Sequence, residues 1–302
     1  MADLAGELRR ALAQAGAAGL AAAAQAALGG LRGLDEPGAA AVMAGDPECG
    51  RLLAQAVAGP EPRTALDALA VRLAELAAAA RCLGCATCCR VSSPTLYAED
   101  LDLVRAGGLP RAALYTLRRG EMVFSARLGS SQPLERELIK LREAPGGGCA
   151  ALAGNACGLY AHRPLQCRHL ECWSGRHAGQ LAARPRLTRR DLLAGDDTAL
   201  ALLAEYEARL PGAALAQALH EAASGRDAAP ALAMLELDHR LRCGIEARYG
   251  YAQEAQHLIL GRPARLVALA HGLELALDGR GRPCLVARRA PAGGTKTPGG
   301  GK

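Results

Sequence analysis

Two arrays of cysteine constrain the fold of this chain more than any other feature. The first array reads Cys82-Leu-Gly-Cys85-Ala-Thr-Cys88-Cys89, and the second begins after 59 intervening residues, at Cys149. Two residues between cysteines let the backbone turn so that both thiolates face one metal while amide groups point at sulfur. In a reducing cytosol, spaced cysteines are more often metal ligands or redox centres than disulfides. The arrays therefore predict a centre folded around metal.

All eight arrayed cysteines are predicted metal ligands, whether the metal is iron or zinc. Four thiolates complete one tetrahedral zinc site or one iron-sulfur cluster, so eight could supply two. The Cβ directions of Cys88 and Cys89 diverge, so this pair could serve two sites or bridge two parts of one. A turn is expected at Pro145-Gly146-Gly147-Gly148, where the backbone must wrap closely around the centre. The predicted ligands are Cys82, Cys85, Cys88, Cys89, Cys149, Cys157, Cys167 and Cys172.

Two arginines lie within the second array and are predicted to assist the bound group. A four-thiolate site carries net negative charge with either zinc or a 4Fe-4S core, and buried charge needs a partner. Arg163 and Arg168 could supply that partner, and the alternative is ordinary surface arginine in an arginine-rich chain. Tyr160 is expected to pack with its hydroxyl hydrogen-bonded, and Pro164 to fix the turn that presents Cys167.

At these residues the sequence resembles the cysteine-cluster proteins of the YkgJ type, a zinc- or iron-chelating domain with a C-x2-C-x2-C-C signature. The opening signature falls on residues 82–89, and the later one, with its Arg-Pro and Cys-Arg pairs, falls on residues 157–168. Cys149 and Cys172 occupy the flanking cysteine positions. The resemblance covers residues 81–175 and implies metal chelation, commonly by an iron-sulfur cluster. A related cluster accompanies flagellin lysine methylation in some proteins, but no substrate or methyl-donor site matches here.

Other candidate ligands are read as bystanders. His162 and His169 lie within the second array, but eight cysteines already suffice, so solvent-facing or hydrogen-bonding histidines are favoured. His239 and Cys243 stand at i and i+4 of an expected helix, where a core thiol beside a surface histidine is favoured over a metal pair. The thiols expected to be unliganded for want of partners at ligand spacing are Cys49 and Cys284.

Helical segments are expected on both sides of the cysteines. Residues 1–80 read as alanine-rich helices with a break near Gly29 to Pro37, and a helix over 64–80 leads into Cys82. After the first array, a short helix from Ser93 should end at Gly107-Gly108, whereas 134–142 is ambiguous between helix and strand. The leucines that make one buried stripe on the 64–80 helix are Leu66, Leu69, Leu73 and Leu76.

The C-terminal part reads as helical up to a terminal hairpin. Thr188 is a plausible N-cap for the first of several Ala/Leu-rich segments that continue to about residue 270. The segments 273–277 and 283–286 flank Asp-Gly-Arg-Gly and predict a β-hairpin. The Gly/Pro/Thr-rich tail, 291–302, is expected to be disordered.

Composition narrows the class of protein. Only 3 of the 36 basic residues are lysine, so the net charge of +6 is typical of a general drift toward arginine, and nucleic-acid binding is disfavoured. The N-terminus lacks the sustained apolar core of a secretory signal, and the longest apolar runs are alanine interrupted by polar residues, so we expect a cytoplasmic chain without a membrane span. Neither a P-loop nor a Gly-x-Ser-x-Gly elbow is present, and whether the chain is an enzyme is left open.

Together these features predict a mainly α fold in which helical flanks surround a loop-rich, metal-stabilised cysteine centre, with a small C-terminal β-hairpin. The predicted segments are an N-terminal helical part (1–80), a cysteine-cluster domain (81–175), a C-terminal helical part (176–290) and the tail. The leading function is an iron-sulfur protein, with a 4Fe-4S cluster, that transfers electrons to a redox partner or supports a modification reaction. The alternative is a zinc-stabilised module that binds a protein partner without catalysis.

Overall fold

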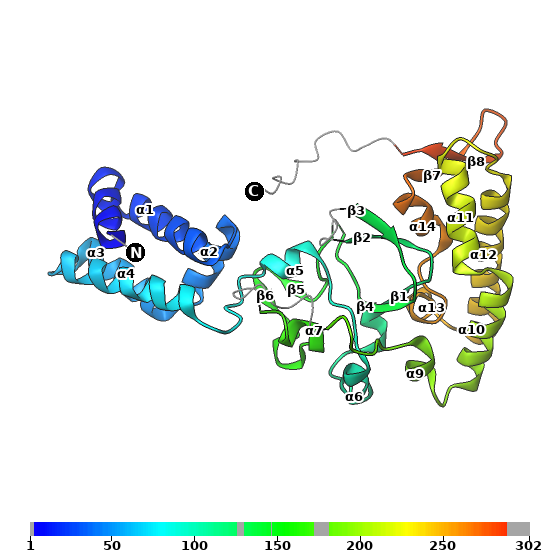
Figure 1. The fold of residues 1–302 in the computed structure, drawn as a ribbon, viewed down its shortest axis with the longest axis horizontal. Helices are drawn as coiled ribbons and strands as arrows, with labels where there is room; N and C mark the ends of the chain where they lie inside the picture. Colours follow the sequence, from blue (N-terminus) through cyan, green and yellow to red (C-terminus); the bar gives the residue numbers. More distant parts are fainter. Residues whose placement is uncertain (1–2, 126–129, 146, 172–180, 289–302) are drawn as a thin grey trace. The chain divides into compact units, whose positions relative to one another are not determined.

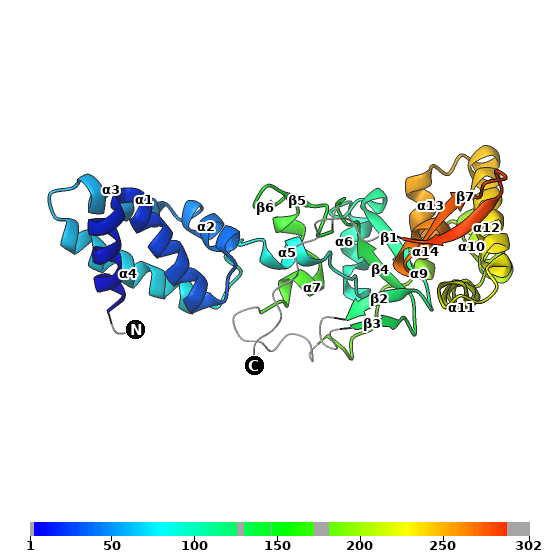
Figure 2. The same cartoon turned by 90° about the horizontal axis from the view of Figure 1, so that it is seen from above.

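The protein divides into two compact units that interleave along the chain. A computed structural model describes residues 3–125, 130–145, 147–171 and 181–288, with the side chains of 124 and 125 left out. Residues 1–109 pack with 141–185, and residues 110–140 pack with 186–302. Both units are rich in helix, and the sheets found in the described ranges are small and two-stranded (Figures 1 and 2). The predicted mainly α fold with a C-terminal hairpin is confirmed.

The N-terminal part of the first unit is a bundle of helices. The predicted break between the first two is present, because Gly33 adopts φ 69° and ends one helix, and Asp35 accepts a hydrogen bond from Gly38 N at 2.9 Å and caps the next. Asp46 caps the third helix in the same way, through Cys49 N at 3.0 Å. The helices are α1 (Leu4–Arg32), α2 (Glu36–Ala44), α3 (Pro47–Ala58) and α4 (Pro62–Ala78).

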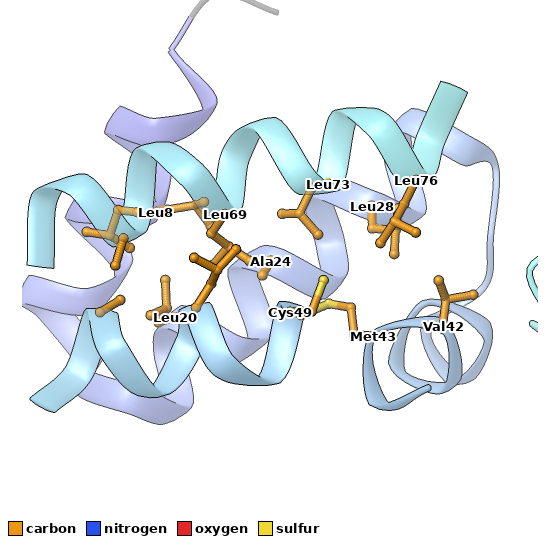
Figure 3. Close-up of a cluster of buried hydrophobic side chains, with 14 of the residues drawn as sticks. Leu8, Leu20, Ala24, Leu28, Val42, Met43, Cys49, Leu69, Leu73 and Leu76 are labelled. Carbon is orange, nitrogen blue, oxygen red and sulfur yellow. The ribbon is translucent and has the colours of Figure 1, made fainter. Parts of the chain in front are cut away.

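Leucines hold this bundle together, as Figure 3 shows. The predicted stripe on α4 faces α1 and α3, and Leu69 and Leu73 are completely buried. Burying one leucine side chain stabilises a fold by about 1.5–3 kcal/mol, so a set of this size can hold four helices without metal. The same apolar cluster includes Cys85, with Leu34 and Leu83 packed against it. The helical core therefore reaches into the first cysteine array.

Helix α1 corrects the expectation that no segment of the chain is apolar enough to span a membrane. It is long and apolar enough, by length and composition, to cross a membrane. Core helices of soluble proteins and signal sequences near an N-terminus pass the same test. Here the helix is interrupted at Gly16, whose φ of 61° and ψ of −151° are not helical, and Leu8, Leu20 and Leu28 are fully buried in the bundle.

The rest of the first unit consists of short elements joined by loops. The short helix predicted after the first array starts later than expected, at Ala98, and Gly107 follows it with φ 79°. In chain order the elements are α5 (Thr87–Val91), η1 (Ala98–Asp100), α6 (Leu101–Arg105), β5 (Leu152–Ala153), β6 (Ala156–Cys157), η3 (Tyr160–His162) and α7 (Leu165–Arg168).

The second unit begins with strands taken from between the two cysteine arrays. In the range 134–142, which the sequence left ambiguous, residues 138–141 form β4, which pairs with β1. These strands pack with the C-terminal helices, so residues 110–140 do not belong to the compact unit that holds the cysteines. A short 3-10 helix, η2 (Arg111–Ala113), directly precedes the first strand. The strands are β1 (Leu114–Leu117), β2 (Met122–Ser125), β3 (Ser130–Pro133) and β4 (Leu138–Leu141). The segment boundaries drawn at 80 and 175 remain a prediction.

Buried ion pairs join these strands to the helices of the same unit. Arg118 is 2 % exposed and donates two hydrogen bonds of 2.9 Å to the carboxylate of Glu207. Arg189 bonds both Glu207, at 2.8 Å, and Glu137, at 2.7 Å. A carboxylate shared by two buried guanidinium groups fixes the unit internally, because losing one partner would leave an uncompensated charge.

The C-terminal helices and hairpin follow the predicted order. Thr188 caps α9 through a capping box with Asp191. The hairpin pairs Leu273 with Ala287. The predicted tail, 291–302, lies outside the described residues. The elements are α9 (Arg189–Leu193), α10 (Asp197–Arg209), α11 (Gly212–Ala223), α12 (Ala229–Tyr249), α13 (Gln253–Ile259), α14 (Ala264–Ala270), β7 (Leu273–Leu277) and β8 (Pro283–Ala287).

Candidate metal centre

The first array forms a tight turn followed by a single short helix. After α4 ends, Gly84 and Ala86 both take left-handed backbone conformations, with φ 70° and 60°. The second is unusual for a residue with a side chain, and it reverses the chain into α5. Cys88 and Cys89 lie on this helix with their sulfurs 3.9 Å apart. Two thiolates on one tetrahedral zinc are separated by about 3.8 Å, from a Zn–S bond of about 2.3 Å, so the pair can serve one centre despite diverging Cβ directions.

Backbone contact joins the two arrays. The predicted turn before Cys149 is present, with a hydrogen bond of 3.0 Å from Ala144 N to Gly148 O. Cys149 N donates a hydrogen bond of 2.6 Å to Cys89 O. Gly148 has φ 80°, and a Cβ there would stand 2.8 Å from Arg90 O and 2.9 Å from Cys89 O. Only glycine allows this approach, so the turn brings Cys149 directly beside α5.

The remaining described cysteines come from a hairpin and a short helix. Cys157 lies on β6 opposite Leu152 of β5. Cys167 lies on α7, and Pro164, predicted to fix the turn that presents this cysteine, directly precedes the helix. The amide of Leu165 donates a hydrogen bond of 2.7 Å to Asp100 Oδ1, and Asp100 is completely buried. The sequence offered no sign of this aspartate, whose role is to hold the start of α7 in place. Cys172, the eighth predicted ligand, lies outside the described residues.

Thiols from both arrays line shared pockets. One pocket, of about 360 Å³, is lined by Cys85, Cys88, Cys89, Cys149, Cys157 and Cys167. Cys82 joins five of these six around a smaller adjoining pocket, whose other walls include Leu34, Leu83, Leu152 and Leu170. The structure therefore brings together all seven of the predicted ligands that it describes. That they bind metal remains a prediction.

The electrostatics of these pockets favour binding of a cation. Burial, and then the neighbouring Cys88, Cys149 and Cys157, raise the pKa of Cys167 to about 12. The contact between the Cys88 and Cys89 thiols raises the pKa of Cys88 and lowers that of Cys89. Several thiolates this close repel one another, so they can be ionised together only when a metal compensates their charge.

The two arginines of the second array lie in different surroundings. The Arg163 guanidinium lies 4.0 Å from the Tyr160 ring and lines both thiol pockets. Its charge also opposes the rise in the pKa of Cys167. Arg168 instead lies 3.8 Å from Asp100, and half of its side chain is exposed. Tyr160 donates from its hydroxyl to Cys82 O at 3.4 Å, as expected, but the residue is exposed rather than packed. The assisting roles of both arginines remain predictions, and the geometry supports Arg163 more directly.

The bystander residues are placed as follows. His169 Nδ1 lies 3.2 Å from Leu165 O, a backbone contact rather than a thiol contact. Cys49 is fully buried in the helical bundle, and Cys284 lies on β8. In the second unit, Cys243 lies 3.8 Å from His239 Nδ1. The expectation of a core thiol at Cys243 is wrong, because this cysteine is exposed.

The chemistry of the donors decides which metal the centre fits. Among the residues that the structure describes, no group of three or more His, Cys, Asp or Glu side chains is arranged to hold a metal ion. The fit therefore rests on the donor set, in which the converging side chains are thiols. Soft thiolate ligands select zinc, Cu(I) and iron-sulfur clusters rather than magnesium or calcium. Zinc and iron-sulfur are the two chemistries that the predicted eight-cysteine set also indicates.

Comparison with known proteins identifies the same region. Residues 81–186 match the CxxCxxCC family model, described as "Putative zinc- or iron-chelating domain". This match confirms the resemblance at the cysteine arrays and covers about a third of the chain. No curated protein matches the chain, and no solved structure matches it.

Proposed function

Because residues 81–186 carry a zinc- or iron-chelating CxxCxxCC domain, we propose that this protein holds an iron-sulfur cluster and uses it in electron transfer or in support of a modification reaction. The observation that carries the proposal is the thiol-lined pocket of about 360 Å³, to which six cysteines from both arrays contribute. The matched domain supports metal binding with either metal, zinc or iron.

Three features of the pocket favour a cluster over a single zinc ion. Seven described thiols converge, which exceeds the four that one zinc requires. They are spread over the walls of a cavity, as ligands of a polynuclear core must be. Leu34, Leu83 and Leu170 give the smaller pocket apolar walls, and burial in apolar surroundings is one of the levers that sets a cluster's potential.

When bound, a cluster of this kind supplies one-electron oxidation and reduction. The protein's own residues then position and tune it. The hydrogen bond between Cys149 N and Cys89 O keeps the two arrays in register, and Asp100 holds the start of α7. Arg163 places positive charge beside the thiols, which offsets the negative charge of the reduced state.

Zinc is the second candidate, and one observation favours it. The sulfurs of Cys88 and Cys89 are separated by about the distance that one tetrahedral zinc requires. In this case the centre would stabilise the fold, and the N-terminal helices would offer a surface to a protein partner. Zinc has no accessible redox step, so this candidate excludes electron transfer.

For location and partners we propose a cytoplasmic protein that exchanges electrons with another protein. Ten described cysteines are free thiols, which suits a reducing compartment. The basic charge is not expected to serve nucleic acid, and the buried Arg118 and Arg189 are used in internal ion pairs.

The deciding experiment is anaerobic purification followed by a visible spectrum and analysis for iron, sulfide and zinc. An iron-sulfur protein should be brown, contain iron and sulfide in comparable amounts, and bleach on reduction with dithionite. The Cys167→Ser variant should lose this absorption, whereas Cys284→Ser, with its thiol on the C-terminal hairpin, should keep it. A colourless wild-type protein with stoichiometric zinc would replace the leading proposal with the zinc module.

A further inference from the structure

The turn between α1 and α2 lies far from the matched domain in sequence but beside its cysteines in space. We propose that this α1–α2 corner (residues 32–35) is the cover of the metal centre, and that its contacts with the first array set how fast the centre exchanges metal. The inference rests on the proposed function in requiring a bound metal. Arg32 and Leu34 line both thiol pockets, although both residues lie outside 81–186.

Asp35 connects the corner to the helix that carries two of the thiols. Its Oδ1 accepts hydrogen bonds from Thr87 Oγ1, at 2.9 Å, and from Arg90 Nη2, at 2.7 Å. Thr87 and Arg90 flank Cys88 and Cys89 on α5. The same oxygen caps α2, so one carboxylate joins the start of α2 to α5. If the corner moved, the bonds from Asp35 would therefore move α5 and with it Cys88 and Cys89.

Arg32 holds the other side of the first array. Its guanidinium donates to Ala77 O at 2.7 Å and to Arg81 O at 3.0 Å. These carbonyls lie at the end of α4 and immediately before Cys82, so the bonds satisfy a helix terminus and fix the entry of the chain into the array. Both ends of the first array are thus anchored to the same corner.

Apolar packing completes the cover. Leu34 and Leu83 pack against the bundle core, which also contains Cys85 at 8 % exposure. The fit is close at Gly38 in the first turn of α2, where a Cβ would stand 2.5 Å from Asp35 Oδ1, 2.7 Å from Thr87 Oγ1 and 3.3 Å from Cys85 O. With this packing in place, the Cys85 thiol is shielded by the helical bundle. Undocking of the corner would expose this thiol and open the pocket to solvent and chelators.

Two pairs of variants separate docking from stability. Gly38→Ala should displace the Asp35 carboxylate and wedge α2 away from α5, and its control is Gly50→Ala on α3, where a Cβ would meet nothing within 4 Å. Asp35→Asn keeps a good N-cap but loses the charge that pairs with Arg90. Its control is Asp46→Asn, which likewise keeps a good N-cap and loses the charge of an ion pair, here with Arg72 at 2.6 Å inside the bundle.

The measurements are release of metal from the full-length protein to a chelator and the rate of alkylation of Cys85. We expect Gly38→Ala and Asp35→Asn to release metal about two- to fivefold faster than wild type, in line with loss of a partly exposed ion pair. Cys85 should be alkylated correspondingly faster. Both control variants should behave as wild type. Equal rates of metal release and of Cys85 alkylation in all four variants would refute the proposal that the α1–α2 corner covers the metal centre.

The same experiment distinguishes failure of this inference from failure of the proposed function. Zinc without iron in the wild-type protein would refute the iron-sulfur proposal. A zinc-specific chelator would then still measure whether the corner variants release metal faster than wild type. A wild-type protein that holds no metal would end the metal-centre function and refute control of metal exchange. Alkylation of Cys85 would then report whether the corner shields the first array: faster reaction in Gly38→Ala and Asp35→Asn alone would retain that contact as a structural one.

Discussion

Substituting the glycine that allows the two arrays to touch tests the geometry of the centre most directly. Gly147 and Gly148 are adjacent and both have positive φ, 99° and 80°. At Gly147 an added Cβ would meet nothing within 4 Å, whereas at Gly148 it would stand under 3.0 Å from two carbonyl oxygens of α5. Gly147→Ala and Gly148→Ala thus share a backbone penalty and differ in the clash.

The expected difference can be worked out from these contacts. A left-handed alanine costs about 1–2 kcal/mol in either variant. Relieving the clash at residue 148 costs about 1–3 kcal/mol more, as overpacking does elsewhere. Displacing the turn also weakens the bond from Cys149 N to Cys89 O, which contributes about 0.5–1.5 kcal/mol. The Gly148 variant should therefore be less stable than the Gly147 variant by about 1.5–4.5 kcal/mol.

The assay combines thermal unfolding with metal analysis of the purified proteins. For a unit of this size each kcal/mol shifts the midpoint by about 2–4 °C, so the two variants should be well resolved. Gly147→Ala should keep its metal, and Gly148→Ala should lose it because the two arrays no longer meet. Equal midpoints and equal metal content would refute the reasoning, since they would mean that contact between the turn and α5 is not needed.

Three further perturbations address the ligands, the arginine and the second unit. Cys167→Ser should lower metal content and thermal stability together, because ligand binding contributes to folding, while Cys284→Ser should change neither. Equal losses in the two variants would mean that the distinction between ligand and non-ligand cysteines is wrong. Arg163→Gln should lower the midpoint potential of an iron-sulfur centre, measured by redox titration, because positive charge favours the reduced state; unchanged potential would make Arg163 an ordinary surface residue. Burial opposes ionisation of Glu207, but hydrogen bonds from Arg118 and the charge of Arg189 outweigh it and lower the pKa. The stabilisation from ionised Glu207 is therefore present above the ordinary carboxyl pKa and is lost as pH falls through the lower pKa of the folded state. Glu207→Gln should lower the free energy of unfolding by about 3–5 kcal/mol at neutral pH. In the variant, the free energy of unfolding should also fall less steeply as the pH is lowered.

Local patterns predicted much of the fold. The leucine spacing over 64–80 identified α4, which spans Pro62–Ala78, and turn residues identified the hairpin of β7 and β8. The cysteine spacing identified side chains that do converge, because coordination of one metal demands short local spacing. These signals succeed because the interacting residues are close in sequence.

Contacts between distant segments left no such signal. The strands between the arrays are four residues long, and β1 finds its partner β4 more than twenty residues later. Asp35 meets Thr87 and Arg90 across separations of 52 and 55 residues. Asp35 caps α2 through a neighbour three residues away, but its second set of partners depends on how the bundle packs.

The division of the chain also changes what the metal has to do. Metal that joined two arrays separated by 59 residues would close a long loop, unless packing already held the two ends of that loop together. In the structure, residues 110–140 of that loop already pack into the second unit, where Arg118 and Glu121 pair with Glu207 and Arg262. The pairing of β1 with β4 and a hydrogen bond of 3.1 Å from Leu141 N to Pro94 O bring the two ends of the loop together, so the cost of closing it does not fall on the cysteines alone. Metal is then needed to neutralise and position the converging thiols, so its contribution belongs to the first unit and to the chemistry of the centre.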